Sequence, residues 1–201
     1  MTLLVKICGL ADEAGVAAAV AAGADAIGFV FHAGSPRNVS PGRARQLAAA
    51  VPAGVRRVAV TLHPGRELVA TVLAEFVPDA WQTDAGDFAA FDLPVPVERW
   101  PVLRAGRAVP EPLPPRFLFE GARSGRGEVA DWSQAAALAR AGELILGGGL
   151  DPGNVGEAVR RVRPFGVDVS SGVESAPGCK DPARIRDFVA AARAAAAGAS
   201  A

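Results

Sequence analysis

A lysine and a cysteine occur two residues apart in the apolar segment 3–8, near the start of the chain. In a β-strand, Lys6 and Cys8 therefore face the same side, with Cys8 at the carboxyl end. The thiol could act as a base or a nucleophile if its pKa were lowered, or it could be a small buried apolar side chain. Lys6 could form a Schiff base, bind an anion, or pair with a carboxylate such as Asp168. The residues alone leave these alternatives open.

A fixed positive charge follows the second apolar segment, in the loop 31–40. Arg37 lies in this loop, and a guanidinium group can bind a carboxylate in bidentate fashion. A solvated loop arginine is the alternative. His32 and His63 each follow an apolar segment too, but no acidic or histidine partner lies at metal-ligand spacing from them. We therefore expect two polar residues at the mouth or surface of the fold, and no metal site.

A carboxylate ends the apolar segment 117–119. Glu120 is a candidate general acid, because desolvation at the end of a buried strand raises the pKa of a carboxyl group. The glycine-rich loop 121–127 behind it could close over a ligand, or could simply be a turn.

Two small-residue loops follow the last two apolar segments. The first loop contains Gly148 and Gly149, and the second contains Ser170, Ser171 and Gly172. Small residues let backbone N–H groups approach an anion, and serine hydroxyls add further donors. In a (β/α)8 barrel, the loops after strands 7 and 8 are adjacent and frequently bind phosphate. Together, the two loops predict a phosphate site.

These candidate residues all follow short apolar segments that alternate with alanine-rich helical segments. Strands buried on both faces of a parallel sheet have this composition, and repeated strand–helix units imply such a sheet. Eight units predict a (β/α)8 (TIM) barrel, with a doubly wound open sheet as the alternative. Seven prolines between residues 88 and 116 leave room for a short fourth helix and a degenerate fifth. The predicted strands are 3–8, 26–31, 57–62, 79–81, 102–103, 117–119, 144–146 and 166–169, and the predicted helices are 13–22, 41–51, 66–76, 132–141, 152–161 and 182–197.

Composition and charge narrow the function classes. The chain of 201 residues is expected to form one barrel domain over residues 1–201. Its 21 basic and 21 acidic residues balance, which gives no reason to expect nucleic acid or an anionic membrane as a partner. The two cysteines, Cys8 and Cys179, exclude a disulfide scaffold, and no secretory signal is evident. We expect a cytoplasmic protein.

Several of these motifs together resemble the phosphoribosylanthranilate isomerase family, and the resemblance covers nearly the whole chain. The most specific motif is the string Asp-Val-Ser-Ser-Gly-Val-Glu from Asp168 to Glu174. The others are Lys6-Ile7-Cys8-Gly9, Ser35-Pro36-Arg37, Gly148-Gly149-Leu150 with Asn154-Val155, Pro177-Gly178 and Lys180-Asp181.

The resemblance implies an activity in tryptophan biosynthesis on a (β/α)8 barrel. The implied reaction is the Amadori rearrangement of N-(5'-phosphoribosyl)anthranilate to 1-(2-carboxyphenylamino)-1-deoxyribulose 5-phosphate, without a metal or organic cofactor. The implied partner is therefore a small phosphorylated substrate, and the chain would be a monomer or a homodimer.

The resemblance also implies a role for each site residue. Cys8 would be the general base, Arg37 would hold the anthranilate carboxylate, and Asp168 would bind a ribose hydroxyl. The phosphate would lie against Gly148, Gly149, Ser170, Ser171 and Gly172.

The sequence departs from the family at two places. The acid at the end of strand 6 is usually Asp, whereas here it is Glu120. Strand 4 often ends in Gln-Leu-His-Gly, whereas here the string is Gln82-Thr83-Asp84-Ala85, which makes Asp84 a rival general acid. Glu120 could instead only pair with Arg123 or Arg126. The alternative functions are another phosphosugar barrel enzyme, such as an epimerase or a Lys6 Schiff-base aldolase, or a binding barrel without catalysis.

Overall fold

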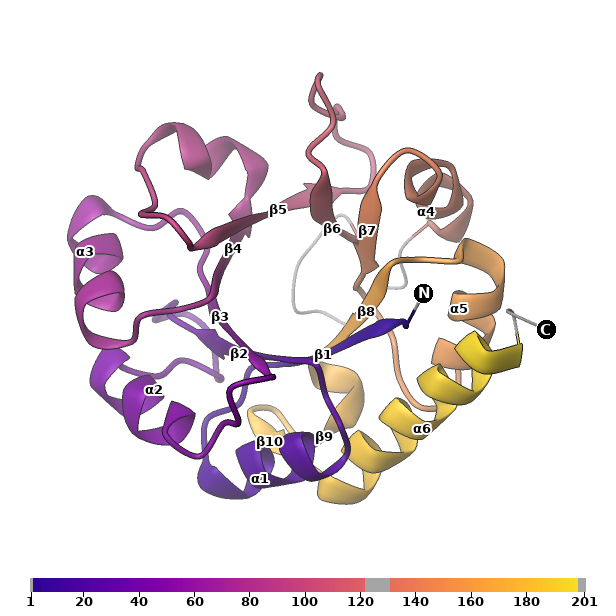
Figure 1. Cartoon of the computed structure of the whole chain (residues 1–201), viewed down its shortest axis with the longest axis horizontal. Coiled ribbons are helices and arrows are strands. Elements are labelled where there is room, and N and C mark those ends of the chain that lie inside the picture. The colour runs from indigo at the N-terminus through magenta and orange to yellow at the C-terminus, as the bar shows by residue number, and fades with distance from the viewer. Residues whose placement is uncertain (1, 122–130, 199–201) are drawn as a thin grey trace.

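Eight parallel strands close into a barrel in the computed structural model, which describes residues 2–121 and 131–198 (Figure 1). Each strand pairs with the next along the chain, and β8 pairs with β1 to close the ring. The predicted barrel is therefore confirmed. The strands are β1 (Leu4–Cys8), β2 (Ala26–Val30), β3 (Arg56–Val60), β4 (Ala80–Asp84), β5 (Glu98–Arg104), β6 (Arg116–Glu120), β7 (Glu143–Leu146) and β8 (Gly166–Val169).

Helices cover the outside of the barrel, as the ring of ribbons in Figure 1 shows. Ser40 accepts a hydrogen bond from the Arg43 N–H and so caps α2, directly before Pro41, as the sequence predicts. The helices in the described residues are α1 (Glu13–Ala21), α2 (Pro41–Ala48), α3 (Arg66–Glu75), α4 (Trp132–Ala139), α5 (Val155–Val162) and α6 (Pro182–Gly198).

The prediction of α5 was wrong at its start. The helix begins at Val155 rather than Pro152, because the preceding residues form a turn. Within that turn, Asp151 accepts hydrogen bonds from the N–H groups of Gly153 and Asn154, and Asn154 accepts one from the Asp151 N–H. The side-chain amide of Asn154 also donates to the Gly149 carbonyl, so the turn is tied to the loop after β7.

The proline-rich region carries no α-helix. A 3-10 helix, η1 (Ala85–Ala89), follows β4, and residues 105–115 after β5 contain only turns and bends. This agrees with the predicted short fourth helix and degenerate fifth. The prediction for β5 itself was too short, since the strand runs through Pro101 from Glu98 to Arg104.

Two apolar layers hold the barrel together. An inner cluster fills the interior of the barrel. Most strands contribute at least one side chain to it, among them Leu4, Val58, Trp100 and Leu118. A larger outer cluster packs the opposite faces of the strands against the helices. Because Lys6 and Cys8 have the parity of Leu4, they continue the inner column toward the carboxyl ends of the strands.

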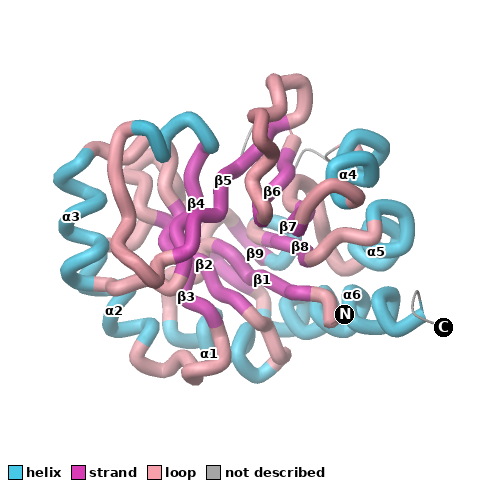
Figure 2. Tube along the Cα trace, turned by 45° about the horizontal axis from the view of Figure 1, so that its top comes forward, coloured by secondary structure: helices cyan, strands magenta, loops and turns pink. Residues whose placement is uncertain are grey.

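The last helix returns to the start of the chain. Arg193 on α6 donates hydrogen bonds to the Leu3 carbonyl and to Asp25, with Nη2 2.6 Å from Oδ2. Figure 2 shows α6 running beside the N-terminal end of β1. No helix in the described residues is long and apolar enough to span a membrane.

A small hairpin, β9 (Glu174–Ala176) with β10 (Cys179–Lys180), follows β8 and a 3-10 turn, η2 (Ser171–Val173). Its turn needs a glycine: Gly178 has φ +83°, and a Cβ there would lie 2.6 Å from the Pro36 carbonyl oxygen. The hairpin therefore lies directly against the loop after β2.

The closing seam of the barrel leaves no room for a side chain at Gly166. A methyl group there would lie 2.9 Å from the Leu4 carbonyl oxygen and 3.0 Å from its Cβ. We predict that Gly166→Ala lowers the free energy of unfolding by about 1–3 kcal/mol, because overpacking forces the seam apart. Gly54→Ala is the control, since nothing lies within 4 Å of a Cβ there. Urea unfolding measures both variants, and equal midpoints would contradict the prediction.

Candidate active site

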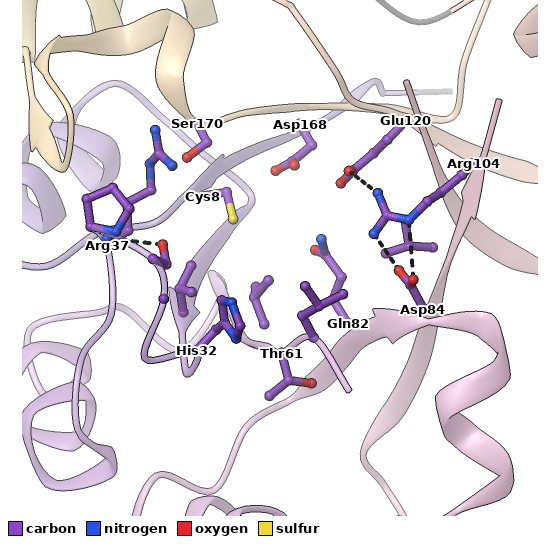
Figure 3. A pocket seen from close by; sticks show the side chains of 17 residues that line it. Cys8, His32, Arg37, Thr61, Gln82, Asp84, Arg104, Glu120, Asp168 and Ser170 are labelled. Carbon is purple, nitrogen blue, oxygen red and sulfur yellow. Dashed lines mark hydrogen bonds and ion pairs between the residues drawn. The ribbon is translucent and has the colours of Figure 1, made fainter. Parts of the chain in front are cut away.

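A cavity of about 440 Å³ opens at the carboxyl ends of the strands. This is the end at which (β/α)8 barrels bind their ligands. Figure 3 shows side chains from several strands, among them β1, β4, β5, β6 and β8, pointing into it. The polar side chains among its lining residues are Cys8, His32, Ser35, Arg37, Thr61, Gln82, Asp84, Arg104, Glu120, Asp168 and Ser170.

A buried ion pair includes Asp168, one of the residues that line this cavity. Lys6 and Asp168 are register partners on β1 and β8, and Lys6 Nζ donates to Asp168 Oδ1 at 2.7 Å. Lys6 is fully buried and Asp168 is 7% exposed. Burial is the largest single influence on Lys6 and acts to lower its pKa, but the charge and hydrogen bond of Asp168 together with the interaction with Cys8 outweigh it, so that the pKa is raised. Lys6 therefore stays an ammonium group. Among the three alternatives for Lys6 that the sequence left open, the structure shows the pairing with Asp168.

Cys8 lies just above this pair and lines the cavity. Burial raises the pKa of its thiol, and the nearby ammonium groups of Lys6 and Lys180 act in the opposite direction. Space for the thiol comes from the neighbouring strand, where a Cβ on Gly28 would lie only 3.0 Å from Cys8 Sγ. The thiol is thus held in a small polar recess rather than in the apolar core.

Arg37 reaches the cavity edge from the loop after β2. Its Nε and Nη2 donate to the two carboxylate oxygens of Glu174 at 2.7 and 2.8 Å. Lys180 Nζ also donates to Glu174 at 2.7 Å, and to the Ser170 carbonyl at 3.0 Å. One guanidinium edge is therefore already occupied by a protein carboxylate, while Nη1 donates to no described residue.

Two carboxylates share one arginine on the other side of the cavity (Figure 3). Arg104, at the end of β5, pairs closely with Asp84 through Nη2, and its Nη1 lies 3.4 Å from Glu120 Oε2. All three side chains are mostly buried. The arginine thus lies nearer to Asp84 than to Glu120.

The two loops predicted to bind phosphate lie against each other. Gly148 and Gly149 have φ values of +83° and +64°, which favour glycine and turn successive peptide groups in an irregular loop. A Cβ on Gly172 would lie 1.9 Å from the Leu150 carbonyl oxygen, so only glycine permits this contact. The structure therefore brings together the loops after β7 and β8.

Asp84 was expected from the sequence as a rival acid at the mouth, but Gln82 and Arg104 were given no role. Gln82 and Asp84 belong to β4, which the apolar pattern ended at residue 81, because their polar side chains face the cavity rather than the core. Arg104 was not singled out, although it directly follows an apolar segment as the other candidates do. His32 lines the cavity, whereas His63 is exposed and bonded to Asp87.

Two further expectations for this region concern residues that the structure does not describe. Arg123 and Arg126, considered as partners of Glu120, and most of the loop 121–127 lie outside the described residues. Ser171 begins the turn η2 directly after Ser170.

The fold and the site define an enzyme of the (β/α)8-barrel class. The family model described as "N-(5'phosphoribosyl)anthranilate (PRA) isomerase" matches residues 5–191 of the chain. The chain belongs to this family of isomerases, and the resemblance seen in its motifs is confirmed.

Individual relatives agree with this assignment. The chain is 43% identical over 215 residues to N-(5'-phosphoribosyl)anthranilate isomerase of Paracoccus denitrificans, covering 96% of this chain and 99% of the relative. It is also similar to phosphoribosyl anthranilate isomerase in complex with reduced 1-(o-carboxyphenylamino)-1-deoxyribulose 5-phosphate (30% identity, TM-score 0.78, 96% and 100% coverage). A structure of monomers generated from the dimeric enzyme of Thermotoga maritima matches at 30% identity, TM-score 0.79 and the same coverage.

The shared carboxylate of Glu174 gives a prediction about stability. Glu174→Gln would leave Arg37 and Lys180 buried without their negative partner, which should lower the free energy of unfolding by about 3 kcal/mol or more near neutral pH. Burial acts to raise the pKa of Glu174, but hydrogen bonds from Arg37 and Lys180 outweigh it and hold the pKa below the ordinary value of 4.5.

The pH dependence of this effect follows from the sign of the shift. The stabilisation is fully present above the unfolded pKa near 4.5 and is lost as the pH falls through the lower folded value. Urea unfolding of both proteins from pH 7 downward should therefore show the difference shrinking below pH 4.5. A difference that stays constant over this range would contradict the ion-pair account.

Proposed function

We propose that this chain catalyses the reaction of its family, the Amadori rearrangement of N-(5'-phosphoribosyl)anthranilate, with Cys8 as general base and Glu120 as general acid. The observation that carries the proposal is a thiol and a carboxyl group that face one cavity from different strands, beside two glycine-rich loops. Loss of the substrate's fluorescence in the presence of the protein tests the activity.

The first chemical step is opening of the furanose ring. It needs a proton at the ring oxygen, which a carboxylic acid at the cavity wall can donate. Glu120 ends β6 with its side chain in the cavity, and a Cβ on the facing Gly147 would lie 3.3 Å from its Cγ. The absence of a side chain at Gly147 supports this role, because it leaves space for the methylene group by which Glu exceeds Asp.

Ring opening gives a protonated Schiff base, which makes the proton on C2' acidic. A thiolate at Cys8 can remove this proton, and the resulting enolamine tautomerises to the ketose. An acid and a base whose pKa values are set by different surroundings suffice for this sequence. No step requires Lys6 as a nucleophile, and its buried pairing with Asp168 speaks against the Schiff-base aldolase alternative.

Anchors at the two ends of the substrate supply orientation. The phosphate lies against Gly148, Gly149, Ser170, Ser171 and Gly172, in the joined loops after β7 and β8. The anthranilate carboxylate lies against Arg37, whose Nη1 side remains for a ligand while Glu174 fixes the other edge. Asp168 accepts a hydrogen bond from a ribose hydroxyl with the oxygen that Lys6 does not use.

The proposed activity also bears on the partner, the oligomeric state and the cellular location of the protein. The partner is a small phosphorylated molecule, the chain acts as a monomer or a homodimer, and it works in the cytoplasm.

The base is tested by comparing the two cysteines. We predict that Cys8→Ser lowers turnover by about 100- to 10,000-fold with little change in substrate binding, because a hydroxyl is a poor base at neutral pH. Cys179→Ser is the matched control, since Cys179 is exposed and does not line the cavity. Steady-state assays measure both. A Cys8→Ser enzyme within threefold of wild type would remove Cys8 from the reaction.

The acid is tested by comparing the two carboxylates that share Arg104. We predict that Glu120→Gln lowers turnover by about two to four orders of magnitude and flattens the limb of the pH–rate profile that depends on the acid. Asp84→Asn should have a smaller effect. If Asp84→Asn shows the large loss while Glu120→Gln stays active, the acid belongs to β4.

Carboxylate recognition is tested with Arg37→Ala. The loss of a charge-assisted pair of hydrogen bonds should weaken binding of the anthranilate-bearing product analogue about tenfold to a hundredfold. Ribose 5-phosphate lacks the carboxylate and should lose much less affinity. Calorimetric titration with both ligands measures the difference, and equal losses would show that Arg37 does not bind the carboxylate.

A further inference from the structure

Cys8 and Lys6 approach each other in a gap that Gly28 leaves between β1 and β2. A Cβ on Gly28 would lie 3.0 Å from Cys8 Sγ and 3.2 Å from Lys6 Nζ. The sulfur and the nitrogen therefore lie within about 6 Å of each other, on the same face of β1, and the two side chains interact. The side chain of any residue larger than glycine at position 28 would fill this gap.

We propose that Lys6 is a positioning residue that favours the thiolate form of Cys8 for proton abstraction, and that Asp168 in turn fixes the Lys6 ammonium group. The inference rests on the proposed role of Cys8 as base. It assigns Lys6 a part in the reaction without contact between Lys6 and the substrate.

The electrostatics of the recess support this role. Burial is the largest influence on Cys8 and keeps the pKa of its thiol raised, so the reactive thiolate depends on the neighbouring positive charges. Lys6 is the strongest of the groups that act in the opposite direction, and Lys180 is a weaker one. Asp168 disfavours the thiolate, but it also keeps Lys6 charged.

The other charged groups that face Cys8 are less suited to the task. Lys180, on β10, and Arg37, after β2, are both bonded to Glu174, which offsets their positive charge. Burial lowers the pKa of Lys180, so its ammonium form is less favoured than that of an exposed lysine. Lys6 is the cation next to Cys8 on the same strand face, and its pKa is raised.

The proton inventory is consistent with this arrangement. When the thiolate takes the C2' proton, Cys8 becomes a neutral thiol and Lys6 keeps its own proton, because Asp168 stabilises the ammonium form. The thiol then gives its proton to the C1' carbon of the enolamine, while the C2' hydroxyl proton passes to solvent as the ketone forms and the Glu120 carboxylate takes up a proton from solvent. Cys8 is a thiolate again beside Lys6, ready for the next turnover.

The experiment measures the thiol directly in a protein with one cysteine. On a Cys179→Ala background, the rate of Cys8 alkylation by iodoacetamide is followed by mass spectrometry as a function of pH, and turnover is assayed over the same range. Lys6→Met should lower the alkylation rate at pH 7 by about tenfold or more, because an opposite charge at this range shifts a pKa by at least a unit. Its midpoint should move to higher pH, and turnover should recover as the pH rises.

Lys6→Met leaves Asp168 as a buried charge without its partner, so a second variant guards against misfolding. Lys6→Met/Asp168→Asn removes both charges, and circular dichroism checks that each variant is folded. In the double variant the alkylation midpoint should also move to higher pH, but by less than in Lys6→Met. A folded variant whose midpoint and reactivity match the background protein would overturn the proposal, since a purely structural lysine would change stability alone. The failure of the base assignment is distinguishable, because it would appear as an active Cys8→Ser enzyme with the alkylation shifts intact.

Discussion

The barrel closes where β1 meets β8, and a lysine and an aspartate are buried against each other at that seam. Removing either partner would leave a buried charge, which is strongly destabilising, so the pair enforces one register between the strands. The same register fixes the mouth of the barrel. Cys8 stands two residues beyond Lys6 and Ser170 two residues beyond Asp168, so the thiol and the start of the last glycine-serine loop are placed side by side.

Paired charge is the common feature of the whole cavity. Arg37 and Lys180 share Glu174, and Asp84 and Glu120 share Arg104. Such pairs hold long side chains in defined positions. The paired side chains are in turn less available to a ligand. Under the proposed function, a substrate carboxylate would bind the edge of Arg37 that Glu174 does not occupy.

Much of this arrangement could be predicted from the sequence, for a simple geometric reason. In a parallel barrel the residue that ends each strand faces the mouth, so Cys8, Glu120 and the loops after β7 and β8 followed from the ends of the apolar segments. The same rule was applied too narrowly at β4 and β5. Gln82 and Asp84 interrupt the apolar pattern within a strand, and prolines around Arg104 concealed a strand of seven residues.

Contacts between distant segments could not be predicted in this way. The pairing of Arg37 with Glu174 depends on the hairpin β9–β10, whose turn lies against Pro36 through Gly178. Two-residue and three-residue strands carry too few side chains for an alternating pattern. Nothing in local composition indicates which carboxylate a loop arginine will meet.

The proposed function requires this mouth to bind the substrate with C2' beside Cys8 and the furanose oxygen beside Glu120. The most direct measurement is a crystal structure of this protein with reduced 1-(o-carboxyphenylamino)-1-deoxyribulose 5-phosphate. We expect the phosphate between the loops of Gly149 and Gly172, the carboxylate on Arg37, and Cys8 Sγ nearest to C2'. A phosphate bound elsewhere in the cavity, or a different side chain nearest to C2', would contradict it.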